Sequence, residues 1–204
     1  MKNLSDAVRI PGLLALCLAS SALFAAEPLK LADFASETKT AQGGSINDVV
    51  YSEKKDDAKL DAKRVADGLL VVSGQVGLGK ASQWAGVGVG ADVGEAGKTV
   101  DASAYQSVTL KLASKTTKRL RLRLFGPDQA TQMNGCYPVK YQDVTATATE
   151  YTIPFSAFAP EGYCGGNGRS VAKTLPALAG FEVVDTAMSR EATEFSIGEV
   201  RLNP

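Results

Sequence analysis

The 204-residue chain contains no histidine, and this absence excludes several common kinds of active site. Without an imidazole there is no Ser-His or Cys-His nucleophile pair, no histidine-bound zinc or iron and no histidine proton shuttle. Any chemistry would have to use carboxylates, lysine, tyrosine, serine or a borrowed metal ion. Basic and acidic residues balance at 22 each and form no basic stripe, which argues against nucleic acid or an anionic membrane as a partner.

The sequence also lacks a long apolar pattern of helical period. Instead, apolar and polar residues alternate nearly everywhere, and turn residues interrupt the alternation about every ten residues. Charge-rich residues 35–67 fit either an exposed hairpin or a short surface helix with a solvated face. Elsewhere the pattern predicts an all-β sandwich of about eight to ten strands, at 29–34, 68–77, 84–92, 106–114, 118–126, 136–146, 149–158, 178–186 and 195–202.

The first residues of the chain have the pattern of an export signal. Lys2 and Arg9 are followed by an apolar run that ends near Phe24, as in a secretory signal peptide. The run is short for a membrane span, although a retained anchor is the alternative. We therefore expect a signal peptide at 1–26 and a single domain at 27–204, periplasmic or secreted, with no membrane span after cleavage.

Three cysteines are present, and one of them, Cys17, lies within the expected signal peptide. Cys136 and Cys164 remain, and an exported protein would join them in a disulfide. The bridge would clamp two irregular segments on either side of the strand at 149–158. Without a Cys-x-x-Cys motif or a neighbouring base, we expect a structural bond that holds a rim in place.

Side-chain alternation separates an inner from an outer face in several strands. Leucine and arginine alternate along 118–126, so the leucines face the core and Arg121 and Arg123 face outward. The same pattern turns Lys111 outward from its strand. Trp84 falls on the same side as the glycines of its own strand, and glycine repeated on one face marks a place where something approaches the backbone closely. Tyr141 could join that face.

An outward tryptophan beside glycines and guanidinium groups is the arrangement that a sugar site uses. The ring stacks on the apolar face of a pyranose, and arginine donates forked hydrogen bonds to hydroxyls or to a uronate. We therefore predict a ligand site made of Trp84, Lys111, Arg121, Arg123 and Tyr141. The alternative is that the arginines form a solvated face and Trp84 packs in the core or at a rim.

Four segments carry a family resemblance, in the order DASAYQSVTLKL (101–112), TEYTIPFSAF (149–158), LAGFEVVDT (178–186) and FSIGEVRL (195–202). They resemble the galactose-binding-like jelly-roll modules, and among these the carbohydrate-binding family 11 and complex I intermediate-associated protein 30 (CIA30) group. The resemblance covers about residues 29–202 and implies a jelly-roll β-sandwich that binds glycans on the concave outer face of one sheet.

The chain departs from that family pattern at two places. Ala148 stands where the family often has tryptophan, and Gly198–Glu199 replaces an acidic pair in the last strand. Related jelly rolls often tie their first and last strands with calcium, so the resemblance implies Asp33 and Glu199 as ligands of a structural calcium ion. No other cofactor is expected.

Three functions follow from the residues and the resemblance together. The first is an exported, non-catalytic module that binds a polysaccharide or cell-envelope glycan. The second is a protein-interaction or assembly factor of the CIA30 type. The third is a small hydrolase that uses two facing carboxylates, although the spacing singles out no pair among Asp143, Glu150, Glu161, Glu182 and Asp185.

Overall fold

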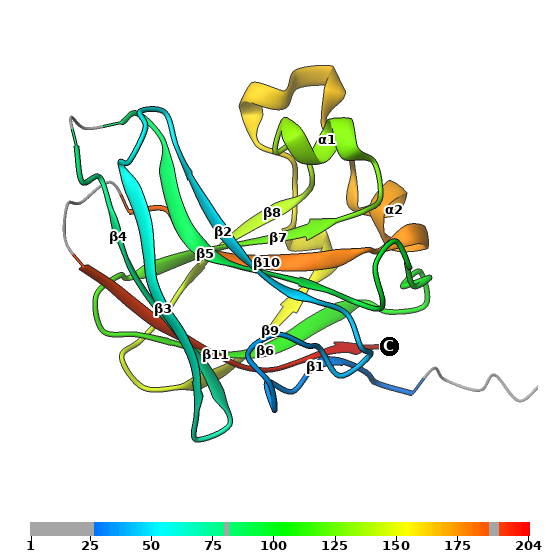
Figure 1. Ribbon diagram of the computed structural model, residues 1–204. Helices are drawn as coiled ribbons and strands as arrows, with labels where there is room; N and C mark the ends of the chain where they lie inside the picture. The colour runs from blue at the N-terminus through cyan, green and yellow to red at the C-terminus, as the bar shows by residue number, and fades with distance from the viewer. Residues whose placement is uncertain (1–26, 80–81, 188–191) are drawn as a thin grey trace, which may run out of the picture.

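The computed structural model describes residues 27–79, 82–187 and 192–204, so the predicted signal peptide at 1–26 lies outside the described residues. Within them the chain forms two β-sheets that pack face to face (Figure 1). The six-stranded sheet has the order β3-β4-β11-β6-β9, and β1 pairs with β11 beside this path. The five-stranded sheet has the order β2-β5-β10-β7-β8. All of these pairings are antiparallel.

The six-stranded sheet consists of β1 (Leu29–Ala32), β3 (Ala58–Ala66), β4 (Leu69–Val76), β6 (Ser107–Ser114), β9 (Thr149–Pro154) and β11 (Ala192–Asn203). The five-stranded sheet consists of β2 (Ile46–Ser52), β5 (Ala85–Asp92), β7 (Arg119–Phe125), β8 (Val139–Asp143) and β10 (Gly180–Asp185). Short helices connect some of the strands: α1 (Gln129–Met133), α2 (Val171–Thr174) and 3₁₀ turns at Phe155–Ala157, Gly162–Asn167 and Leu175–Ala177.

The alternation of leucine and arginine in β7 shows why the two sheets pack together. Leu120, Leu122 and Leu124 are at most 4% exposed and lie in the core between the sheets. Val108, Leu110 and Leu112 of β6 are buried in the same core from the other sheet. Burying each such side chain contributes about 1.5–3 kcal/mol relative to leaving it exposed. The predicted all-β sandwich and its inward faces are confirmed.

The charge-rich segment at 35–67 differs from both expectations. It supplies β2 and β3, which belong to different sheets, because β2 pairs with β5 and β3 pairs with β4. Lys63 of β3 links the two strands, since its Nζ donates to Asp48 at 2.7 Å and to the Ile46 carbonyl at 3.1 Å. The segment forms neither a hairpin nor a helix, because pairing with distant strands determines its structure.

A rim rises above the outer side of the five-stranded sheet, where Figure 1 shows α1 next to the loop that follows β9. We call residues 128–137 and 160–169 the disulfide rim, because Cys136 and Cys164 are bonded with their Cα atoms 5.5 Å apart. The predicted disulfide is thus present. Fully buried Tyr137 anchors the first half, since its hydroxyl accepts from the Asp128 amide at 2.9 Å.

No helix in the described ranges is long and apolar enough to cross a membrane.

Candidate functional site

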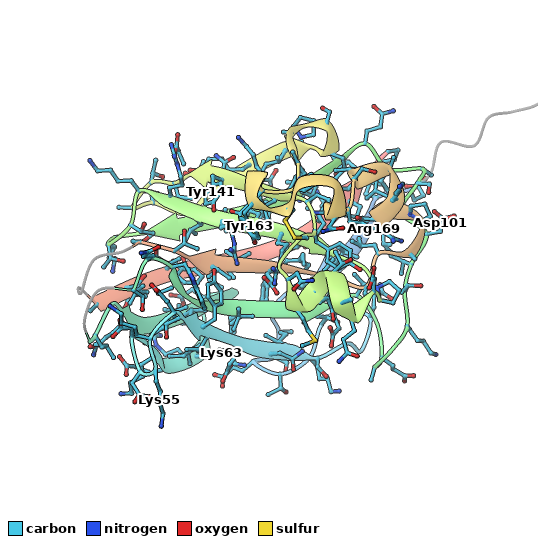
Figure 2. All side chains as sticks on the ribbon, turned by 90° about the horizontal axis from the view of Figure 1, so that it is seen from above. Lys55, Lys63, Asp101, Tyr141, Tyr163 and Arg169 are labelled. Carbon is cyan, nitrogen blue, oxygen red and sulfur yellow. A yellow bond between two sulfur atoms is a disulfide. The ribbon has the colours of Figure 1, made fainter. Side chains whose placement is uncertain are left out.

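The outer face of the five-stranded sheet brings together residues from β7, β8 and β10. Arg121 is opposite Val184 on one side and Tyr141 on the other, while Arg123 is opposite Glu182. Strand neighbours in register point to the same side of a sheet. We call this surface the arginine face, and Figure 2 looks down on it, with Tyr141 and Tyr163 labelled.

Two arginines of this face are buried and share one carboxylate. Arg123 Nη2 donates to Glu182 Oε1 at 2.5 Å, and Arg121 Nη2 lies 3.9 Å from Glu182 Oε2. Their side chains are only 12% and 9% exposed. Arg119, further along β7, is exposed and pairs with Asp143 at 2.8 Å. The arginines therefore face outward as expected, but they form the covered floor of the face and not a row of open donors.

Aromatic rings cover this floor from the side of β2 and β5. The Arg121 Cζ atom lies 5.3 Å from the centroid of the Tyr51 ring, a cation–π contact. The Trp84 ring is in turn 6.3 Å from the Tyr51 ring, centroid to centroid. Trp84 itself is 52% exposed. Trp84 therefore offers an open ring next to Tyr51, and Tyr51 covers the Arg121 guanidinium group.

The glycines of β5 make room for this arrangement. Gly86 is opposite Tyr51 in the sheet, and a Cβ atom at Gly86 would lie 2.5 Å from Tyr51 Cζ. A larger residue at position 86 would therefore displace the Tyr51 ring. The close approach that the glycines predicted is real at Gly86, but the approaching group is a side chain of the protein itself.

The side of the arginine face that is formed by β8 and the disulfide rim carries two further tyrosines, Tyr141 and Tyr163. The Tyr141 hydroxyl donates to the Glu161 carboxylate. Tyr163 comes from the disulfide rim and is 68% exposed, with its hydroxyl 3.4 Å from the carbonyls of Asn134 and Gly135. These contacts connect β8 to the rim and leave the face of the Tyr163 ring open to a ligand.

Two open grooves run beside Tyr141. The larger has a volume of about 760 Å³ and is lined by Arg119, Tyr141, Glu161 and Tyr163 among others. The smaller, about 360 Å³, is lined by Thr117, Lys118, Arg119, Tyr141, Thr186 and Ala187. Since Arg119 and Tyr141 line both, the grooves meet there. An extended ligand could lie along them.

The tyrosine hydroxyls of this face remain hydrogen-bond donors at neutral pH. Burial raises the pKa of Tyr51 to about 12. Burial, followed by the hydrogen bond to Glu161, likewise raises the pKa of Tyr141 to about 12. Both values lie above the ordinary tyrosine pKa of 10.0, so folding favours the protonated forms.

These shifts predict a loss of stability in alkaline solution. The stability that the raised pKa values provide is complete below about pH 10 and is lost as the pH rises through about 12. We expect the thermal unfolding midpoint to fall across this window, and to fall less in Tyr51→Phe, which has no phenol to ionise at that position. An equal fall in both proteins, measured by circular dichroism, would show that Tyr51 makes no contribution.

Lys111 is the predicted site residue that the structure does not bring to this face. It lies in β6 of the six-stranded sheet. Its Cβ would be 2.8 Å from a Cβ placed on Gly198 of β11, so its side chain lies across the outer side of that sheet. The prediction that it points away from the core holds, but it points away on the opposite side of the molecule.

The residues predicted to hold calcium do not fit that ion. Glu199 is 2.9 Å from Lys30 Nζ and 3.4 Å from Arg201 Nη1. Its carboxylate is therefore already paired with two basic side chains. The Asp33 Oδ1 atom accepts from the Ala35 amide at 3.2 Å. Over the residues that the structure describes, no group of three or more His, Cys, Asp or Glu side chains could hold a metal ion.

Sequence reasoning missed Tyr51 and Tyr163, and it named Glu161 and Glu182 only as possible hydrolase carboxylates, not as residues of this face. The sequence did indicate that Glu182 faces outward, because it lies between the inward-facing Phe181 and Val183. What the sequence did not show was that its strand lies between β5 and β7. Tyr51 lies in the segment at 35–67, for which the sequence allowed either a hairpin or a helix. Glu161 and Tyr163 lie in the disulfide rim.

Neither the family models nor the curated proteins match this sequence, whereas solved structures match the fold. A family 11 carbohydrate-binding module of the cellulosomal cellulase Lic26A-Cel5E of Clostridium thermocellum superposes with a TM-score of 0.56 and 16% identity, covering 87% of this chain and 94% of that one. A family 11 module from the same organism, in complex with a β-1,3-1,4-mixed-linked tetrasaccharide, gives a TM-score of 0.58 at 16% identity, covering 86% and 95%.

A third structure is the family 30 carbohydrate-binding module of the C. thermocellum cellulase Cel9D-Cel44B, with a TM-score of 0.51, 11% identity and coverage of 87% and 98%. The chain has the jelly-roll β-sandwich fold of these modules. At these identities the similarity shows the fold and confirms that part of the prediction. The resemblance to the CIA30 group stays a prediction.

Proposed function

We propose that the protein is an exported, non-catalytic module that binds a polysaccharide or cell-envelope glycan on its arginine face. The observation that carries the proposal is the exposed Trp84 ring, which lies against Tyr51, whose own ring covers Arg121 on that face. An open indole ring stacks on the C–H face of a pyranose, and polar groups beside it fix the orientation of the sugar. The carbohydrate-binding modules of the same fold support this choice, and the disulfide suits an exported protein.

The carboxylates that a hydrolase would need have other partners. Glu182 pairs with two arginines, and Glu150 pairs with Arg201 at 2.9 Å on the other sheet. Buried Asp185 accepts hydrogen bonds from Thr193 and from the Ala187 amide. These contacts favour binding over hydrolysis as the function of the face.

A protein partner is the second candidate, and one observation favours it. Met133, the last residue of α1 in the disulfide rim, is 81% exposed, and Tyr163 from the other half of the rim is 68% exposed. Methionine and tyrosine are enriched in protein interfaces. A partner that binds the rim would suit the interaction or assembly role.

Affinity electrophoresis with Trp84→Ala tests the glycan proposal. We expect a soluble glycan in the gel to retard the wild-type protein, and Trp84→Ala to weaken binding by about tenfold or more, the usual effect of removing a central aromatic residue. Lys111→Ala is the control, because its side chain lies on the other sheet; its retardation, measured against a glycan-free gel, should equal that of the wild type. Equal retardation of Trp84→Ala would remove the proposed site.

A further inference from the structure

Buried polar atoms without a hydrogen-bond partner gather on the arginine face. Among the described residues, four of these atoms are Tyr51 Oη, Arg121 Nε, Arg123 Nε and Glu182 Oε2. Each buried group left without a partner costs about 1–3 kcal/mol, and such groups in a native protein call for an explanation. Four of them in one cluster indicate a place where a ligand or water completes the hydrogen bonds.

The cluster contains both donors and acceptors. The two Nε–H groups only donate, the Glu182 Oε2 atom only accepts, and the Tyr51 hydroxyl does both. Arg121 and Glu182 are 8% and 9% exposed, so both are more than nine-tenths buried. They come from adjacent strands, and the Tyr51 ring from β2 covers the guanidinium group of Arg121. The Tyr51 ring therefore lies between the Arg121 guanidinium group and a ligand on the face.

The charges of the cluster select against an acidic ligand. Glu182 offsets one of the two guanidinium charges. Glu161, held by the Tyr141 hydroxyl, also acts electrostatically on Tyr51 and supplies a second carboxylate. The two carboxylates offset the two guanidinium charges, so a sugar carboxylate entering here would lose its hydration with no net positive charge to compensate. A hydroxyl group, which donates and accepts at once, suits the unpartnered atoms.

We propose that Tyr51, Arg121, Arg123 and Glu182 form an inner subsite for two neighbouring hydroxyls of an uncharged sugar, and that Glu182 selects hydroxyls over carboxylates. One hydroxyl donates to Glu182 Oε2 and accepts from an arginine Nε–H, and the other pairs with the Tyr51 hydroxyl. This inference rests on the proposed glycan-binding function. It names the ligand class of the face and a covered subsite that opens on binding.

Tyr51→Phe tests the subsite because it removes one buried, unpartnered hydroxyl and keeps the ring. The variant should be at least as stable as the wild type in thermal unfolding, since the free protein loses no hydrogen bond. Its affinity for the glycan should nevertheless fall by about threefold to tenfold. Trp84 is the single tryptophan of the chain and lies next to Tyr51, so its emission can report the titration. Tyr151→Phe in β9 of the other sheet is the matched control.

Glu182→Gln tests the selection of hydroxyls. Glutamine accepts a weaker hydrogen bond than a carboxylate, so affinity for a neutral glycan should fall about tenfold. The variant also leaves two guanidinium groups with Glu161 as their remaining carboxylate. Affinity for polygalacturonate should rise at low salt and fall again as salt screens the new charge. Glu150→Gln, which opens the Arg201 pair on the opposite sheet, should change neither. Should Glu182→Gln fail to fold, the result with Tyr51→Phe decides.

The probes are mixed-linkage β-1,3-1,4-glucan, galactomannan and polygalacturonate, each titrated against all four variants and the wild type. Binding of a neutral glycan that weakens in Tyr51→Phe, without loss of stability, supports the subsite. Preference of the wild type for polygalacturonate, or unchanged binding by Tyr51→Phe, overturns the inference and leaves the glycan-binding function standing. No binding of any of the three by the wild type counts against both.

Discussion

Replacing Cys136 and Cys164 together by serine is expected to lower the free energy of unfolding by about 3.5 kcal/mol. The bond closes a loop with a sequence separation of 28 residues, and the chain-entropy estimate for a loop of this size gives that value. Glycan binding should weaken as well, because the rim carries Glu161 and Tyr163 beside the groove. Urea unfolding without reductant measures the first effect, and affinity electrophoresis measures the second.

Reduction of the wild-type protein provides the control for this prediction. With dithiothreitol the wild type should unfold at the urea midpoint of the double-serine variant, whose own midpoint should not move. If the variant matched the oxidised wild type in both stability and binding, the bridge would neither restrict the unfolded chain nor position the rim.

The largest loss of affinity is expected from Arg121→Met, about a hundredfold. The substitution keeps much of the side-chain stem but removes the guanidinium group on which the Tyr51 ring rests. Stability should change little, because Glu182 keeps its shorter contact with Arg123. The readout is therefore a titration followed by Trp84 emission, together with a thermal unfolding curve.

Arg201→Met is the matched control for that variant. Arg201 pairs with Glu150 and Glu199 on the outer side of the six-stranded sheet, so its removal should leave glycan affinity unchanged. Equal losses in the two variants would mean that the effect spreads through the whole sandwich and does not arise on the arginine face. Full affinity in Arg121→Met would show that the guanidinium group has no part in binding.

Local alternation was enough to predict much of the fold. In β6 and β7 the apolar side chains had to share one side, so Leu110 and Leu122 could be assigned to the core from neighbouring residues alone. The disulfide was predictable because two cysteines lie outside the predicted signal peptide. Both inferences depend on the local sequence or on composition, and neither requires knowing which strands are neighbours.

The candidate site depended on information that alternation does not contain. Alternation says that Lys111 and Arg121 both face away from the core, but it does not say that β6 and β7 belong to different sheets. It also could not show that Arg121 is covered, because the covering groups, Tyr51 and Glu182, are far away in sequence. Strand order across a sheet comes from long-range pairing, and that pairing determines which outward residues meet.

The position of β11 has a consequence for how the molecule folds. This strand follows all its partners in the sequence, yet it lies inside the six-stranded sheet, with β6 along one edge and β4 and β1 along the other. None of those three strands has its central neighbour until β11 is available. A sandwich with such distant pairings is expected to fold slowly. The six-stranded sheet can thus be completed only after β11 has been synthesised, so it cannot assemble strand by strand along the chain.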